Sequence, residues 1–143
     1  MPGRFFVLLV SVACLSMCIP GCGGEKGAKV TGVIVANGQP IQVPEKEIVL
    51  MGFVPVQKDE NSVKANPGAE FKRDDASFLF VGPGLGLVPP GEYKVVLTIR
   101  PRGGPDRFAG KFSPEKTPLT YTVTNDPKQH IVIDVEKKTV TRP

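Results

Sequence analysis

The sequence predicts an all-β protein: an antiparallel, Greek-key β-sandwich of about seven or eight strands, preceded by a signal peptide. From residue 30 onward, apolar and polar residues alternate with a period of two in short segments, as expected for half-buried strands. The chain also holds 16 glycines and 15 prolines, many of which separate these segments, and no segment of the mature chain has a helical period. Short strands separated by turn residues are typical of a β-sandwich.

The first 21 residues predict an export signal. Arg4 is their only charged residue, and residues 5–19 form an uninterrupted run of apolar or small residues. A membrane-spanning helix needs about 20 apolar residues. A shorter run that follows a basic start therefore predicts a secretory signal peptide over residues 1–21.

The signal peptide ends at a cysteine, Cys22, with Ile19 three positions before it and Gly21 directly before it. This pattern resembles the lipobox of bacterial lipoproteins, which implies that Cys22 becomes the first mature residue and carries diacylglycerol as a thioether. Two or three acyl chains make a stable membrane anchor, since each buried methylene contributes about 0.8 kcal/mol. Cys18 is the competing position, but Met17 stands where the pattern needs a small residue. The remaining alternative is an ordinary cleaved signal with an incidental cysteine.

The mature chain divides into a tether, one domain and a tail. Residues 22–29 are polar and rich in glycine, which predicts a flexible tether. Residues 30–136 carry the strand patterns and form one domain, and the tail over residues 137–143 is expected to fray. The other two cysteines of the chain lie in the signal peptide, so the mature chain has no pair for a disulfide bond. A packed core must therefore stabilise the domain.

The first strand patterns form two hairpins and one buried strand. Residues 29–41 hold Asn37-Gly38 between two extended apolar stretches, the strongest short-range signal for a hairpin with a type I′ turn. Glu47–Val56 is apolar on both faces and predicts a strand buried between layers. Residues 69–73 and 77–81 flank a polar turn and predict a second hairpin.

Three further segments, residues 91–100, 119–125 and 130–138, alternate between apolar and polar residues. Each therefore predicts a strand with one face toward the core. The side chains expected in the core are Tyr93, Val95, Leu97, Ile99, Leu119, Tyr121, Val123, Ile131, Ile133 and Val135. By the same alternation, His130 and Asp134 fall on the polar face of the last segment.

The order of these segments resembles a known family. The stretches FLFVGPGLGLVPPGEYKVVL (residues 78–97) and DRFAGKFSPEKTPLTYTV (residues 106–123) carry this resemblance, and its most specific pieces are PPGEYKV (residues 89–95) and KFSPEKTPLTYTV (residues 111–123). With the lipobox, they resemble the small planctomycete-type lipoproteins whose domain is similar to carboxypeptidase regulatory-like and transthyretin-like sandwiches, which are broadly Ig-like. The resemblance implies a fold and a place in the cell envelope, but no activity. By similarity to bacterial lipoproteins, Gly23 after Cys22 implies sorting to the outer membrane rather than the inner one.

The stretch LVPPGEY contains a predicted structural corner. Leu87, Pro89 and Tyr93 match the spacing of the tyrosine corner of fibronectin-like sandwiches. Prolines cannot donate backbone hydrogen bonds, so this crossing between sheets leaves carbonyl groups without strand partners. A buried phenol needs a partner as well. We therefore expect the Tyr93 hydroxyl to bond a backbone group between residues 85 and 90, with its ring in the core.

The residue inventory does not predict an enzyme or a cofactor. His130 is the only histidine, so both a metal site of several imidazoles and a Ser/His/Asp triad would depend on this one side chain. The net charge of +4 is modest, and an exported protein does not meet nucleic acid. The arginines between residues 100 and 107 therefore predict a solvated loop rather than a nucleic-acid site.

We therefore expect a lipid-anchored, extracytoplasmic and non-enzymatic module of the cell envelope, either structural or protein-binding. The alternative is a ligand-binding module, a glycan-binding one for example, that uses the long loop Pro101–Pro118. Its candidate contacts with a ligand or partner are Arg102, Arg107, Phe108 and Phe112. The structural interpretation, which the sequence favours, is that both phenylalanines fold back and cap the open end of the sandwich.

Overall fold

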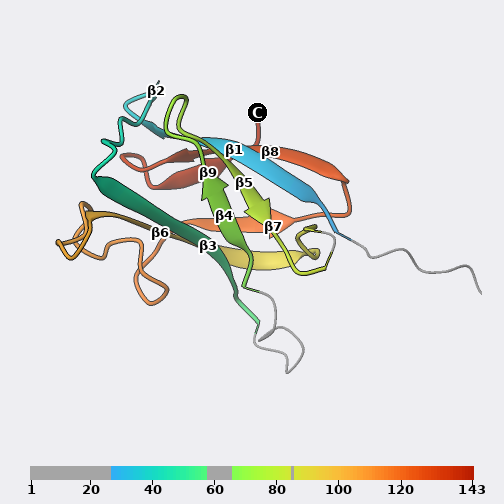
Figure 1. Ribbon diagram of the computed structural model, residues 1–143. Helices are drawn as coiled ribbons and strands as arrows, with labels where there is room; N and C mark the ends of the chain where they lie inside the picture. Colours follow the sequence, from blue (N-terminus) through green and yellow to red (C-terminus); the bar gives the residue numbers. More distant parts are fainter. Residues whose placement is uncertain (1–26, 58–65, 85) are drawn as a thin grey trace, which may run out of the picture.

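A computed structural model describes residues 27–57, 66–84 and 86–143, and these residues form nine β-strands and no helix (Figure 1). In chain order the strands are β1 (Lys29–Ala36), β2 (Gln39–Pro40), β3 (Glu47–Pro55), β4 (Gly68–Phe71), β5 (Ser77–Val81), β6 (Gly91–Pro101), β7 (Thr120–Val123), β8 (Lys128–Asp134) and β9 (Thr139–Thr141). The predicted all-β, sandwich-like fold is confirmed, with nine strands instead of seven or eight. The predicted signal peptide and Cys22 lie outside the described residues.

The strands form one continuous sheet that bends around the core. Its order is β7-β6-β3-β4-β5-β1-β8-β9, with β2 paired to the end of β1. Figure 1 shows β3 and β6 in the lower layer and β1 and β8 in the upper layer, with the β4–β5 hairpin in front. The two ends of the sheet, β7 and β9, approach each other, so the sandwich is nearly barrel-shaped.

The pairing of β1 with β8 is parallel, so the prediction of a wholly antiparallel sheet is wrong at this ladder. Seven register pairs connect the two strands, from Lys29 opposite Lys128 to Val35 opposite Asp134. A parallel pair needs a long connection, and here most of the domain lies between the two strands in sequence. The ladder therefore joins the first and the last long strand of the domain.

Gly32 allows the close packing around this ladder. A Cβ atom at this position would lie 2.2 Å from the carbonyl oxygen of Ile131 and 2.4 Å from the ring of Phe78. Phe78 is 3% exposed and meets the ring of Phe80 edge-on, with centroids 5.3 Å apart. The missing side chain at Gly32 thus lets an aromatic ring from β5 cover the backbone of β1.

The C-terminal tail was expected to fray. Instead, its residues Thr139–Thr141 form β9. Val132, Ile133 and Asp134 pair with residues 139–141 in an antiparallel ladder. Asp134 also stabilises the turn before β9, because its Oδ1 accepts the backbone N–H groups of Glu136 and Lys137 at 3.0 and 2.9 Å. This use of the carboxylate explains why Asp134 is 7% exposed, although the alternation placed it on the polar face.

Both predicted hairpins are present. Asn37 and Gly38 have φ angles of 52° and 76°, and they connect β1 to β2 as a two-residue type I′ turn requires. The hairpin of β4 and β5 turns through Ala76, whose φ angle is 54°. The carboxylate of Asp75 accepts the backbone N–H of Ser77 at 3.0 Å and fixes this turn.

The core consists mainly of the side chains that the alternating patterns predict, but β3 differs. Met51 and Phe53 are buried, and the Phe53 ring stacks on Phe80 with centroids 3.7 Å apart. Leu50, on the opposite face of β3, is 51% exposed. The predicted burial of both faces is therefore wrong, because the outer face is only half-buried at Ile48, Gly52 and Val54 and is open at Leu50.

Gln129 is a buried polar side chain that joins β8 to β7. Its exposed fraction is 2%, and its Oε1 accepts the hydroxyl of Tyr121 at 2.6 Å. Its Nε2 donates to the carbonyl oxygens of Thr124 and Asp126, at 3.0 and 2.9 Å. One amide thus holds β7 and the following turn against β8. Burial raises the pKa of Tyr121, and the positive charge of Arg142 opposes this rise.

Replacing Gln129 with leucine should destabilise the domain by about 2–4 kcal/mol, since three hydrogen bonds are lost and the Tyr121 hydroxyl is left without its partner. Denaturant unfolding measures this loss. The matched control is Gln39→Leu on the exposed β2 strand, which should change the free energy of unfolding by less than about 0.5 kcal/mol. Equal effects of the two substitutions would contradict this role of Gln129.

Candidate functional site

The long loop Pro101–Pro118 covers the edge of β6. The N–H of Leu97 donates to the carbonyl oxygen of Phe112 at 3.2 Å, and the N–H of Arg107 donates to that of Ile99 at 2.7 Å. The carboxylate of Asp106 accepts the N–H of Ile99 at 3.1 Å. These bonds occupy backbone groups of β6 beyond the short β7 strand. The loop therefore protects a sheet edge that would otherwise be open to pairing with another chain.

The two phenylalanines of this loop cap the sandwich, as the structural interpretation predicts. Phe112 is 1% exposed, and Phe108 packs against it edge-on with ring centroids 5.0 Å apart. Phe108 is itself half-buried against the core. A ring that stacks on a sugar must present a free face, so the expected ligand contact through Phe112 is wrong.

The two arginines of the loop differ in their surroundings. Arg102 is exposed in the turn that follows β6. Arg107 forms an ion pair with Glu47, and its Nη1 donates to the carbonyl oxygen of Gln42 at 3.0 Å. A third arginine, Arg73 in the turn between β4 and β5, also contacts this region, because its guanidinium donates to the backbone carbonyl of Glu47. Arg107 thus ties the loop to the start of β3, which is a structural role.

The predicted tyrosine corner has the expected geometry. The Tyr93 hydroxyl donates to the carbonyl oxygen of Pro89 at 2.9 Å, and its ring is 4% exposed. Burial raises the pKa of the Tyr93 hydroxyl. Leu87, the third residue of the pattern, is half-buried, and the next residue, Val88, exchanges two backbone hydrogen bonds of 2.9 Å with Ala28. The corner therefore lies beside the point where the chain enters β1.

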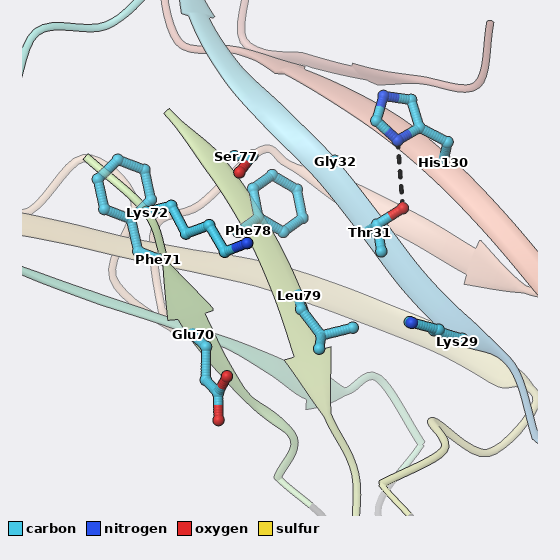
Figure 2. A pocket seen from close by; sticks show the side chains of 10 residues that line it. All are labelled: Lys29, Thr31, Gly32, Glu70, Phe71, Lys72, Ser77, Phe78, Leu79 and His130. Atoms are coloured by element: carbon cyan, nitrogen blue, oxygen red, sulfur yellow. Dashed lines mark hydrogen bonds between the residues drawn. The ribbon is translucent and has the colours of Figure 1, made fainter. Parts of the chain in front are cut away.

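A groove on the outer face of the sheet gathers polar side chains from several strands (Figure 2). It has a volume of about 710 Å³ and lies over β4, β5, β1 and β8. The register places four of its residues in one row across these strands, in the order Glu70, Leu79, Thr31 and His130. In Figure 2, Lys72 extends from the end of β4 and Lys29 from the start of β1, with Leu79 between them.

The Thr31 hydroxyl orients the imidazole of His130. It donates to the carbonyl oxygen of Gln129 at 3.4 Å and lies 3.2 Å from Nδ1 of His130. Which of the two atoms donates in this contact depends on the tautomer of the imidazole. The contact holds the Nδ1 edge of the ring against β1, and no described residue forms a hydrogen bond with Nε2.

The groove suits binding better than catalysis. Its serine, Ser77, pairs with Val33, whereas His130 pairs with Thr31 on the opposite side of β1. The hydroxyl and the imidazole are therefore separated by a strand and do not form a nucleophile and base pair. The groove offers ammonium groups, hydroxyls, one carboxylate and the apolar surface of Leu79, which can recognise a ligand through charge and contact.

A second hollow, apolar and of about 390 Å³, lies on the outer face of β3 and β6. Gly52 and Gly68 are paired in register beneath it, so two neighbouring positions carry no side chain. Leu50, Val54 and Val96 surround this gap.

The alternating pattern placed the residues of both hollows on polar or buried strand faces. It did not predict that the residues of each hollow come together from several strands. The alternation indicates the face on which a side chain lies, but the row through Glu70 and His130 depends on the pairing of four strands. Gly32 and Gly52 were the sequence features that could have indicated these hollows, because glycine is disfavoured inside a strand and leaves a position without a side chain.

The described ranges also lack two features that would point to other functions. No group of three or more His, Cys, Asp or Glu side chains could hold a metal ion there. No helix in those ranges is long and apolar enough to cross a membrane. The chain matches no protein-family model, no curated protein and no solved structure.

Replacing Tyr93 with phenylalanine should lower the free energy of unfolding by about 1 kcal/mol, because the ring stays in the core while the hydrogen bond to Pro89 is lost. Thermal or denaturant unfolding at neutral pH measures the change. A variant that unfolds like the parent would show that the corner contributes nothing to stability.

Proposed function

We propose that the protein is a lipid-anchored, extracytoplasmic β-sandwich that acts as a non-enzymatic structural or protein-binding module of the cell envelope. The observation that carries this proposal is the lipobox-like pattern at Cys22, which follows a short apolar run and precedes a single sandwich domain by a few residues. The predicted acyl chains on Cys22 hold the domain at a membrane surface, and Gly23 favours the outer membrane.

The composition of the domain surface supports protein binding. Leu50 and Val56, both on or next to β3, are 51% and 41% exposed, and Leu50 borders the apolar hollow over Gly52. Exposed apolar side chains grouped around a hollow are typical of sites that receive an apolar side chain of a partner. The proposed partner is therefore another protein of the envelope.

The two phenylalanines of the loop Pro101–Pro118 have a structural role, because they pack on each other and on the core. Phe112 is in the core, and Arg107 is engaged by Glu47, so the loop offers Arg102 and the half-exposed edge of Phe108 to a ligand. This is less than a glycan site needs, because sugars bind to the open faces of aromatic rings. The glycan-binding alternative is therefore not part of the proposal.

Replacing Cys22 with serine should abolish incorporation of an alkyne-labelled fatty acid and leave the protein uncleaved or soluble, because serine has no thiol to alkylate. In-gel detection of the label, with fractionation of the membranes, measures both effects. The matched control is Cys18→Ser, which should retain the label and the membrane location. Label that persists in Cys22→Ser and disappears in Cys18→Ser would assign the anchor to the other cysteine. Label that is absent from the parent would overturn the proposal.

A further inference from the structure

Two lysines lie side by side at the start of the β1–β8 ladder. Lys29 on β1 and Lys128 on β8 are register partners in the parallel ladder, and both are exposed. Neighbouring strands lie about 4.8 Å apart, so two like charges in this position repel each other. Among the described residues, neither ammonium group has an ion-pair partner.

The carboxylates closest in the strand pairing do not compensate this charge. Asp126 lies two positions before Lys128, but it forms an ion pair with Arg142, which holds its pKa below the ordinary value. Glu70 lies on β4, and β5 and β1 separate it from β8. The two lysines thus present a local positive charge that the described part of the domain leaves uncompensated.

A shallow hollow of about 300 Å³ lies beside this pair of lysines. It is lined by Lys29, Thr31, Lys128, Gln129 and His130, and it adjoins the larger groove of Figure 2. The Thr31 hydroxyl contacts Nδ1 of His130, and no described residue forms a hydrogen bond with Nε2, so an Nε2–H group can donate to a ligand. Two ammonium groups and an oriented imidazole around one hollow are the groups that bind a phosphate.

We propose that Lys29, Lys128 and His130 form a binding site for a phosphate group, with Thr31 as the residue that positions His130. A phosphate monoester carries about −1.5 to −2 at neutral pH, and the phosphodiester of a lipid headgroup carries one negative charge, so two ammonium groups can neutralise either. A bound phosphate would also offset the repulsion between the ammonium groups of Lys29 and Lys128, so the pairing of two lysines is less costly in the bound state.

The source of the phosphate is a lipid headgroup, and this part of the inference rests on the proposed lipid anchor. Lys29 follows Cys22 by seven positions in the sequence. A chain of this length spans at most about 25 Å. An acyl anchor on Cys22 therefore keeps the hollow close to the headgroups, where anionic lipid attracts each lysine by about 1 kcal/mol.

His130 is the only histidine of the chain, so its imidazole signals in NMR report on this site alone. The first experiment titrates the mature protein, in neutral detergent, with inorganic phosphate. We expect a saturable shift of the imidazole signals. In Lys29→Gln/Lys128→Gln the dissociation constant should rise by up to about fivefold for each lysine, since an exposed ion pair contributes up to about 1 kcal/mol. The matched control, Lys111→Gln/Lys116→Gln in the loop, has the same change in charge and should bind like the parent.

The second experiment places the same protein in nanodiscs of phosphatidylglycerol or of phosphatidylcholine. A shift of the His130 signals in phosphatidylglycerol alone, lost in Lys29→Gln/Lys128→Gln, supports the headgroup as the source. A response to inorganic phosphate without a response to phosphatidylglycerol supports the site and assigns it to a soluble phosphate. No response to either probe, or a dissociation constant for phosphate that is unchanged in Lys29→Gln/Lys128→Gln, overturns the proposal. Failure of the protein to enter any nanodisc would count against the lipid anchor instead, because the phosphate titration does not need it.

Discussion

The parallel ladder between β1 and β8 is the constraint on which the rest of the structure depends. It joins the beginning and the end of the domain through seven register pairs, and it places Ile34 beside Ile133 in the core. The same register brings Gln129 to the position from which its amide reaches β7 and the turn after it. Without this ladder the sheet would end at β1, and β8 and β9 would have no place in the core.

The ladder also connects the fold with the proposed function. It brings the residues that follow the predicted anchor next to the start of β8, so Lys29 and Lys128 meet on the surface. The tyrosine corner supports this region from the other side, since Val88 bonds to Ala28 directly before β1. The exposed side chain of Leu50 lies on another strand of the sheet, so the proposed anchor and the proposed partner-binding face lie on separate parts of the domain.

Local patterns predicted much of this architecture. Alternation identified the core faces of β6 and β8, Asn37-Gly38 predicted the first turn, and the prolines before Tyr93 predicted a hydrogen bond within the corner. The parallel pairing, the formation of β9 and the charged row of the groove were not predictable, because a period of two indicates a face but not the neighbouring strand. The burial of both faces of β3 was predicted wrongly, since apolar composition does not show whether another layer covers a strand.

Native-state hydrogen exchange tests the central role of the β1–β8 ladder most directly. Amides that open only through global unfolding exchange with the full free energy of unfolding, whereas those of edge strands exchange through local opening. The structure predicts that hydrogen-bonded amides of β1 and β8 reach the free energy measured by denaturant unfolding and equal those of the long β3–β6 ladder. Exchange of β8 at a clearly lower free energy than β3 and β6 would show that it is an appendage of the sheet, and would contradict the account.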